Sequence, residues 1–351
     1  MVQLRKRILF ITGSINQTTQ MHQIAEQLPE YDCWFSQIFS DSPFIKSVIK
    51  HTSLADTTVL AGQFKAHSEE YLYKHGLKMD YRAKKNHYDL VVHCSDLIVA
   101  DSLRKYKSIW VQEGMIDKYR LSSAIVKKLG LPAYLSFDTS LNGSGNVCDI
   151  YCAASDGYKN YFNKLGTERD RIIVTGMPNY DDCNQYLDND FPFRDYVMVA
   201  TSDLRETYRK EDRPAFIREA VKTAAGRQLL FKLHPNEKFE RAEAEIKKNA
   251  PAGTMIFRGG STNHMIANCS ELITQYSTVV YTGLALGKKV HSYFDVEELK
   301  KLAPVQNGGT SAKNIANICR AYIEFEGPRD TFLKQFVYHP EKVTRMVEEY
   351  A

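Results

Sequence analysis

Two residues, one in each half of the chain, have the side chains and the positions needed for proton transfer. Glu113 follows a short apolar run and precedes Gly114, which predicts a carboxylate at the carboxyl end of a strand. His234 follows another apolar run, and Pro235 behind it keeps the histidine out of a helix. A carboxylate of raised pKa can take a proton from a hydroxyl group, and a histidine can donate to a phosphate oxygen or a departing group. A helix-capping glutamate and a backbone-bonded histidine are the structural alternatives.

Hydroxyl and basic side chains gather around the predicted strand ends of the second half. Ser277 and Thr278 lie between a predicted strand and a predicted helix, where unpaired N–H groups and the helix dipole favour a phosphate. The same two residues would also serve as ordinary N-caps. Lys232 should share a strand face with His234, two residues on. The full set of candidates for binding nucleotide or phosphate is Thr201, Ser202, Arg205, Lys232, Pro235, Phe257, Arg258, Gly259, Ser277 and Thr278.

The first loop of the chain offers a place for a second ligand. Gly13 and Ser14 follow the first predicted strand, and a glycine there lets a ligand approach the main chain. We expect Gly13, Ser14 and Gly114 to contact the acceptor of a transfer reaction. The loop lacks the GxGxxG pattern and the Walker lysine, so it does not indicate a dinucleotide site or a P-loop. A plain tight turn is the alternative interpretation.

These candidates need elements that place them at the ends of strands. Apolar runs of strand length alternate with helix-like segments along the whole chain, which predicts an α/β fold with two doubly wound parallel sheets. The predicted strands are 8–12, 90–92, 97–99, 108–112, 150–153, 172–174, 196–200, 228–233, 255–257, 272–274 and 289–293. The predicted helices are 18–28, 121–129, 156–165, 213–225, 239–249, 263–267, 279–286 and 312–325.

The pattern restarts after a stretch rich in Asn, Asp and Pro, which divides the chain. We predict a Rossmann-like acceptor domain at 1–180, a linker at 181–195 and a Rossmann-like nucleotide-binding domain at 196–327. Residues 328–351 show helical spacing of apolar residues, at Phe332, Phe336, Val343 and Val347. They are predicted to pack back toward the first domain, a simple terminal helix pair being the alternative. Two such domains form a cleft at the carboxyl ends of their strands, where open α/β sheets bind ligands.

The composition disfavours a nucleic-acid-binding protein, a membrane-spanning protein and a disulfide- or zinc-stabilised protein. The 351 residues include 46 Lys and Arg against 42 Asp and Glu, a net charge of +4 without a basic block, so no nucleic-acid partner is expected. No apolar stretch approaches the roughly 20 residues of a membrane span, and the amino terminus does not resemble a signal peptide. The seven cysteines show no paired CxxC spacing, which disfavours a disulfide framework or a zinc site and predicts a cytoplasmic protein.

At this point the chain resembles the GT-B glycosyltransferase superfamily over nearly its whole length. Gln112-Glu113-Gly114, His234-Pro235 and Ser277-Thr278 are similar to three short motifs of bacterial sialyltransferases and polysialyltransferases. Related HP motifs occur in Kdo transferases and CDP-glycerol glycerophosphotransferases, and residues 174–181 resemble the interdomain crossing of the superfamily.

The resemblance implies a role for each motif. Glu113 would be the general base, His234 would assist departure of the CMP group, and the Ser277-Thr278 pair would hold phosphate, with no metal. The sequence departs from the pattern at Gln112, where a second carboxylate is common, so Glu113 is the base candidate that this motif retains.

A second resemblance is to the non-hydrolysing UDP-N-acetylglucosamine 2-epimerases. Residues 199–206 are similar to the opening of their second domain, and Gln112-Glu113-Gly114-Met115 to a glutamate-containing loop. Residues 276–283 do not fit, because those enzymes carry an acidic, glycine-containing loop followed by paired glutamates.

The sequence therefore predicts a cytoplasmic, metal-independent GT-B transferase. It would move a sugar or polyol phosphate from a nucleotide-activated donor, CMP- or CDP-linked, to a cell-surface polysaccharide, glycan or lipid-linked acceptor. The donor is a substrate, and no further cofactor is expected. Without a membrane span, contact with a membrane would be peripheral. The alternatives are an epimerase-like enzyme and a non-catalytic protein that binds nucleotide sugars.

Overall fold

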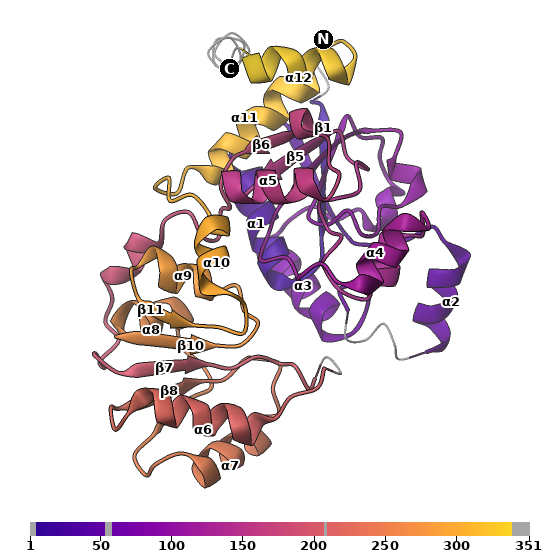
Figure 1. The fold of residues 1–351 in the computed structure, drawn as a ribbon. Coiled ribbons are helices and arrows are strands. Elements are labelled where there is room, and N and C mark those ends of the chain that lie inside the picture. The colour runs from indigo at the N-terminus through magenta and orange to yellow at the C-terminus, as the bar shows by residue number, and fades with distance from the viewer. Residues whose placement is uncertain (1–4, 53–57, 207–208, 339–351) are drawn as a thin grey trace. The chain divides into compact units, whose positions relative to one another are not determined.

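The computed structural model describes residues 5–52, 58–206 and 209–338, and these fold into two compact units (Figure 1). The first unit contains the described residues up to Asp181 and those from Asn307 onward. The second is Asp182–Gln306. Each unit is built on its own parallel sheet with interleaved helices, which confirms the predicted fold class.

The sheet of the first unit has six parallel strands in the order β2-β1-β3-β4-β5-β6. They are β1 (Arg7–Thr12), β2 (Asp32–Gln37), β3 (Leu90–His93), β4 (Lys107–Val111), β5 (Ile150–Ala153) and β6 (Ile172–Val174). The helices are α1 (Ile15–Glu26), α2 (Pro43–His51), α3 (Gly62–Lys74), α4 (Leu121–Lys128), α5 (Asp156–Lys164), α11 (Ser311–Glu324) and α12 (Arg329–Tyr338).

Both faces of this sheet are buried, as expected for continuous apolar strands. Alternate residues of β4 point to opposite faces. Ile109 and Val111 join the core that also contains residues of α1 and α11, whereas Trp110 packs edge-on against Phe162 of α5 at 5.3 Å. Successive strands are therefore held rigidly, and the loops at their carboxyl ends start from fixed positions.

The helix predicted at 312–325 belongs to the first unit and not to the second, which corrects the predicted domain at 196–327. This helix, α11, buries Ile315 and Cys319 in the core of the six-stranded sheet, and the following α12 adds Phe332. Asp181 marks the return of the chain, because its carboxylate accepts the backbone N–H of Ser311 at 2.7 Å. The sequence of an apolar helix that follows a parallel-sheet domain does not show whether the helix packs on that sheet or on the sheet of the other domain. Val343 and Val347, and the side chain of Phe336, lie outside the described residues.

The second unit has a five-stranded parallel sheet in the order β11-β10-β7-β8-β9. Its strands are β7 (Val197–Ala200), β8 (Leu229–Lys232), β9 (Met255–Phe257), β10 (Glu271–Thr274) and β11 (Lys289–His291). Its helices are α6 (Arg213–Ala224), α7 (Phe239–Asn249), α8 (Thr262–Asn268), α9 (Val280–Ala285) and α10 (Val296–Leu302). One face buries Val199 and Phe231 against Phe216 of α6 and Ile246 of α7.

Of the predicted linker at 181–195, Asp181 belongs to the first unit and residues 182–195 are a folded part of the second, which corrects that boundary. Cys183 is buried in a short 3-10 helix, Cys183–Leu187. Asn189 and Asn268 exchange side-chain hydrogen bonds at 3.1 and 2.9 Å, and Phe191 packs against Phe257. The polar residues of this stretch make turns and side-chain bonds within the unit, although the same composition is typical of flexible linkers.

Two local predictions in the first unit were wrong or incomplete. Residues 97–99 form no strand, although Leu97-Ile98-Val99 is an apolar run. They line a pocket instead. Strand β2 was not predicted, because its first three residues are only half-buried and include Asp32, which bonds to Arg7 and Lys78.

Candidate functional site

The turn after β4 is fixed by Gln112. Its side chain is fully buried, where its Nε2 donates to the carbonyl of Gly114 at 3.1 Å and its Oε1 accepts the N–H of Ala154 at 2.9 Å. An amide is needed here, because a carboxylate cannot donate to a carbonyl oxygen. The departure from the acidic motif at position 112 is thus a structural requirement of this turn, and the buried Gly114 is part of it.

Glu113 is presented beside the start of α1. The side chain of Gln17 hydrogen-bonds to the Glu113 carboxylate, and burial raises the Glu113 pKa to about 7 although this bond opposes the shift. Gln17 Oε1 accepts the N–H of Ser14 at 2.9 Å, so the amide nitrogen faces Glu113. A carboxyl group of this pKa can accept a proton near neutral pH, as the sequence predicts for a general base.

Gly13 and Ser14 hold Gln17 in place. Ser14 is the N-cap of α1, and its hydroxyl accepts the N–H of Gln17 in a capping box. A Cβ on Gly13 would lie 2.1 Å from Gln17 Oε1, so a larger residue here would push the Gln17 side chain out of this position. The structure gives both residues a role in positioning, and their predicted contact with an acceptor stays a prediction.

His234 lies just beyond β8 in the second unit, with its main chain and ring both bonded. Its N–H donates to Glu237 Oε2 at 2.8 Å and to Thr201 Oγ1 at 3.1 Å. The ring Nδ1 accepts the N–H of Asn236 at 3.2 Å and lies 3.7 Å from a carboxylate oxygen of Asp203. With Nδ1 used as an acceptor, the neutral ring carries its proton on Nε2. The side chain is 35% exposed, so this N–H can donate to a ligand.

A buried network of charges supports the histidine loop. Glu237 pairs with Arg213 at 2.6 Å and also accepts the hydroxyl of Thr201. Arg213 pairs with Glu211 at 2.9 Å, and Arg205 bridges from Glu211 to another carboxylate, Glu245, which it binds through two nitrogens at 2.8 Å. Glu237 and Arg213 are almost completely buried. Charged side chains therefore join the loops after β7 and β8.

The cations predicted to bind phosphate are engaged with the protein itself. Arg205 belongs to the network above, and Arg258 binds Glu243 of α7 at 2.6 Å. Lys232 is buried, which lowers its pKa, and its Nζ donates to the carbonyls of Leu233 and Arg258 at 3.0 and 3.1 Å. In the described structure all three cations have partners within the protein, and their predicted contact with phosphate stays a prediction. Sequence spacing could not show the pairs of Arg205 with Glu245 and of Arg258 with Glu243, because the two partners of each pair lie on different elements.

The Ser277-Thr278 pair precedes α9 but does not start it, which corrects the predicted helix at 279–286. The helix begins at Val280 and has six residues, and Ser277 and Thr278 form the turn before it through their carbonyls. Strand β10 ends at Thr274, and the chain must turn before it can begin the helix. Both residues are half-buried. Because α9 is short and begins two residues after Thr278, its dipole contributes little at this pair. The predicted contact with phosphate therefore depends on the two hydroxyl groups.

Four loops of the second unit meet at the carboxyl edge of its sheet. Ser202 donates to the carbonyl of Tyr276 at 3.4 Å, which joins the loops after β7 and β10. The N–H of Leu233 donates to Phe257, which joins the loops after β8 and β9. Next to this junction Pro235 and Gly259 are exposed, and a Cβ on Gly259 would meet no atom within 4 Å. This edge, which carries His234 after β8, is the candidate nucleotide site.

Several functional candidates were missed by the sequence analysis. Gln17 supports Glu113, and Glu237, Asn236 and Asp203 fix His234. Ser14 and Gln17 have the spacing of a capping box, and Glu237 has helical spacing from His234. Those two signals were present in the sequence. The approach of Asp203 to the ring depends on the neighbouring strand and had no local signal.

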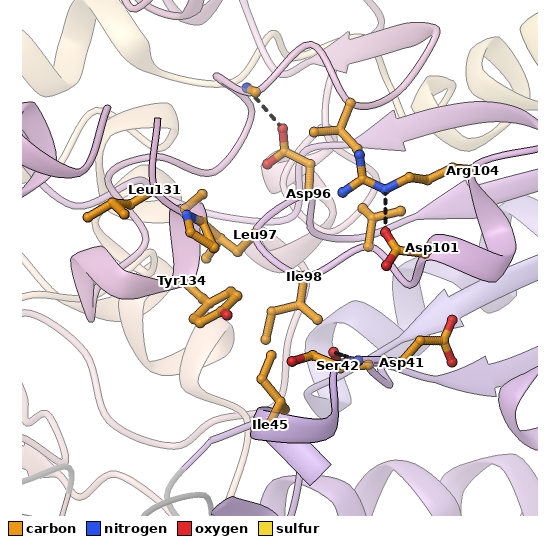
Figure 2. A pocket seen from close by; sticks show the side chains of 16 residues that line it. Asp41, Ser42, Ile45, Asp96, Leu97, Ile98, Asp101, Arg104, Leu131 and Tyr134 are labelled. Carbon is orange, nitrogen blue, oxygen red and sulfur yellow. Dashed lines mark hydrogen bonds and ion pairs between the residues drawn. The ribbon is translucent and has the colours of Figure 1, made fainter. Parts of the chain in front are cut away.

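A separate pocket of about 440 Å³ lies within the first unit (Figure 2). Apolar side chains such as Ile45, Leu97 and Leu131 line it together with the Tyr134 ring and Asp96. The Asp96 carboxylate accepts N–H groups at 2.7 and 3.2 Å and a tyrosine hydroxyl at 3.1 Å, and burial raises its pKa to about 6. This carboxylate is bonded within the protein and braces the pocket wall. Glu113 does not line this pocket.

Within the described ranges, no three His, Cys, Asp or Glu side chains are grouped so that they could hold a metal ion. Across those same ranges, none of the helices has the length and apolar character to cross a membrane.

Solved structures were found that share the fold over almost the whole chain. UDP-GlcNAc 2-epimerase from Methanocaldococcus jannaschii, in complex with UDP-GlcNAc and UDP, has 16% identity and a TM-score of 0.56, covering 90% of this chain and 99% of the other. UDP-GlcNAc 2-epimerase from Neisseria meningitidis bound to UDP-GlcNAc has 13% identity and a TM-score of 0.54, with coverage of 90% and 99%. The 2-epimerase from Rickettsia bellii has 10% identity and a TM-score of 0.53, with coverage of 91% and 97%.

No family model and no curated protein matches the sequence. The chain has a GT-B-like fold of two parallel-sheet α/β domains. At these identities the similarity establishes the fold alone.

Proposed function

We propose that the protein is a GT-B glycosyltransferase that uses a nucleotide-activated donor and no metal. The observation that carries the proposal is His234, whose ring is fixed through Nδ1 and presents Nε2–H at the carboxyl edge of the second sheet. A donor group at such an edge can stabilise the charge that develops on a leaving nucleotide phosphate. The hydroxyls of Ser277 and Thr278 and the open main chain at Gly259 would hold the rest of the nucleotide.

Glu113 supplies the complementary step in this proposal. With a pKa of about 7, its carboxylate takes the proton of an acceptor hydroxyl as that oxygen attacks the anomeric carbon of the donor. In a sugar donor the bond from that carbon to the oxygen of the nucleotide phosphate breaks. In a CDP-polyol donor the acceptor oxygen instead attacks the phosphorus that carries the polyol, and the bond from this phosphorus to CMP breaks. In both cases His234 donates to the departing phosphate oxygen of the nucleotide. We propose CMP or CDP as the nucleotide and a surface glycan or lipid-linked sugar as the acceptor, on the basis of the motif resemblance. The cytoplasm is the proposed compartment.

The first test is calorimetry with CMP, CDP, UMP and UDP, with and without Mg²⁺. Preference for CMP or CDP that is independent of Mg²⁺ would support the proposal and limit the donor to a CMP-sugar or a CDP-polyol. Preference for UDP would contradict the cytidine assignment.

The second test separates catalysis from binding at His234. In His234→Ala we expect turnover with the matching donor to fall by at least about 100-fold, while nucleotide affinity changes little, because the lost donor acts on the leaving group. The control is His75→Ala, which removes the histidine directly after α3 in the first unit and should retain full turnover. Unchanged turnover in His234→Ala would contradict the role.

An epimerase-like enzyme is the second candidate, favoured by the fold similarity to three UDP-N-acetylglucosamine 2-epimerases. Against it, the turn after β10 carries Tyr276-Ser277-Thr278 and no carboxylate. Incubation with UDP-N-acetylglucosamine, followed by NMR, decides between the two enzymes, since only the epimerase would convert it to the 2-epimer. Tight nucleotide binding with no turnover of any donor would favour the third alternative, a non-catalytic binding protein.

A further inference from the structure

Large apolar side chains are exposed together on one stretch of the first unit. Leu121, Ile125 and Leu129 occur at intervals of four residues on α4, and the first and last are 76% and 65% exposed. Residues four apart share one face of a helix, so these side chains form an outward stripe. Leu131 and Phe137 follow the helix along the chain and are also exposed, Phe137 to 88%. We name these five residues the α4 patch.

Such clustering requires an explanation, although single exposed apolar residues do not. The inner face of the same helix buries Val126 and Ser123, so α4 is already anchored to the unit by its other side. Its outer face is therefore available to a partner without any rearrangement of the unit.

The charges around the α4 patch identify the class of partner. Residues 117–138 contain four cations, Lys118, Arg120, Lys127 and Lys128, against the two carboxylates Asp117 and Asp138. Both carboxylates accept hydrogen bonds from neighbouring residues, at 2.9 Å from the Thr139 hydroxyl in the case of Asp117. Exposed apolar side chains bordered by cations match a surface of apolar chains beneath anionic headgroups.

A second helix with the same character flanks the neighbouring pocket. On α2, Ile45 lines the pocket from one side, and Leu131 of the α4 patch lines it from another (Figure 2). The outer side of α2 exposes Phe44, Lys46 and Lys50. Helix α2 thus adds exposed apolar and basic side chains beside the pocket that Leu131 also lines.

We propose that the first unit docks on an anionic lipid membrane through the α4 patch and the exposed face of α2. A second copy of the chain is a poorer occupant, because a twofold interface places the same patch against itself and would bring like charges together. The proposal concerns the surface of the first unit and does not rest on the proposed function.

The test is sedimentation of the full-length protein with vesicles. We expect at least about tenfold stronger binding to vesicles of phosphatidylglycerol mixed with phosphatidylcholine than to phosphatidylcholine alone, falling with added salt. The double variant Leu121→Ser with Leu129→Ser should lose at least about tenfold of this binding, because two apolar side chains no longer enter the interface. Lys128→Glu should weaken binding to the anionic vesicles specifically.

A matched control is Leu187→Ser, which changes a leucine that is 54% exposed in the second unit and should bind like the unchanged protein. Equal binding to both vesicle types, or full binding by the double variant, would overturn the proposal. Sedimentation velocity tests whether a second copy of the chain binds the α4 patch instead. A dimer that dissociates in the double variant would assign the patch to a second copy and would also overturn the proposal.

Fluorescence of a label attached to the α4 patch tests membrane insertion without removing several apolar side chains. An environment-sensitive fluorophore on Leu121→Cys should shift to shorter emission wavelength on the anionic vesicles, whereas one on Tyr73→Cys of α3 should not. The native cysteines are buried, apart from the half-buried Cys33. Absence of a shift at position 121 would contradict insertion of the α4 patch.

Discussion

The Glu113 carboxyl combines two opposing influences at the scale of a single side chain. Burial raises its pKa, and the hydrogen bond from Gln17 limits the rise, so that the pKa settles at about 7. A fully solvated carboxylate would be too weak a base, and an unsupported buried one would stay protonated at neutral pH. The pair therefore holds the Glu113 pKa near neutral pH, where a carboxyl group can both accept and release a proton.

This environment predicts how activity depends on pH. Because the carboxyl must be deprotonated to act as a base, kcat/KM should rise with pH and level off above about 7. Glu113→Gln should lower turnover by about 100-fold or more and abolish this limb of the profile. Glu70→Gln, at an exposed position on α3, is the control. An unchanged pH profile in Glu113→Gln would show that another group is the base.

Gln17 gives a separate prediction about positioning. Gln17→Leu removes the donor that stabilises the Glu113 carboxylate, so the Glu113 pKa should rise further and the acidic limb of the profile should move to higher pH. A purely structural role in the α1 capping box would lower thermal stability without moving the profile. Measurement of kcat/KM against pH, with thermal unfolding of the same variant, separates these outcomes.

The elements of the second unit were the part of the fold that the sequence predicted best. Helix α7 and strand β9 have the predicted bounds, because their apolar periods are clear and Pro and Gly punctuate their ends. The run at 97–99 failed because three consecutive apolar residues can line a pocket as readily as form a strand.

In the candidate site, features that depend on neighbouring residues could be predicted from the sequence, and contacts between distant segments could not. The positions of Glu113 and His234 after strands were predictable, since parallel strands end at one edge of a sheet. The ion pair of Arg205 with Glu245 was not predictable, because Glu245 lies 40 residues away on α7 and the two side chains meet only in the folded unit. Long-range pairing of charges leaves no periodic pattern in a sequence.

The charge network between the loops after β7 and β8 predicts a large stability effect. Arg213→Ala leaves the buried carboxylates Glu211 and Glu237 without their cation, which should cost about 3–5 kcal/mol in the free energy of unfolding. Lys300→Ala removes an exposed pair with Glu297 on α10 and should cost at most about 1 kcal/mol. Chemical unfolding of both variants checks the contrast, and equal losses would contradict it.

Over the whole molecule, the chain leaves the first unit at Asp181 and re-enters it at Asn307. The returning α11 contributes Ile315 and Cys319 to the core of the six-stranded sheet, so that core needs both segments. The second unit is one continuous segment with its own sheet and core.

This arrangement predicts opposite outcomes for two shortened chains. A fragment of residues 182–306 should fold alone and give dispersed amide NMR signals. A chain that ends at residue 306 should keep the second unit folded but lose the native first unit, because the core surface covered by α11 is exposed. Near-ultraviolet circular dichroism and limited proteolysis report this loss. A first unit that stayed protease-resistant without α11 would contradict the assignment of that helix.

The discontinuous first unit also determines an order of events during synthesis. As the ribosome releases the chain from its amino terminus, β1 to β6 emerge early but wait for α11, whereas the second unit is complete as soon as residue 306 is released. The later part of the chain can thus reach its native form first. During that interval the apolar sheet of the first unit is uncovered, and this is when a chaperone would be most useful to the protein.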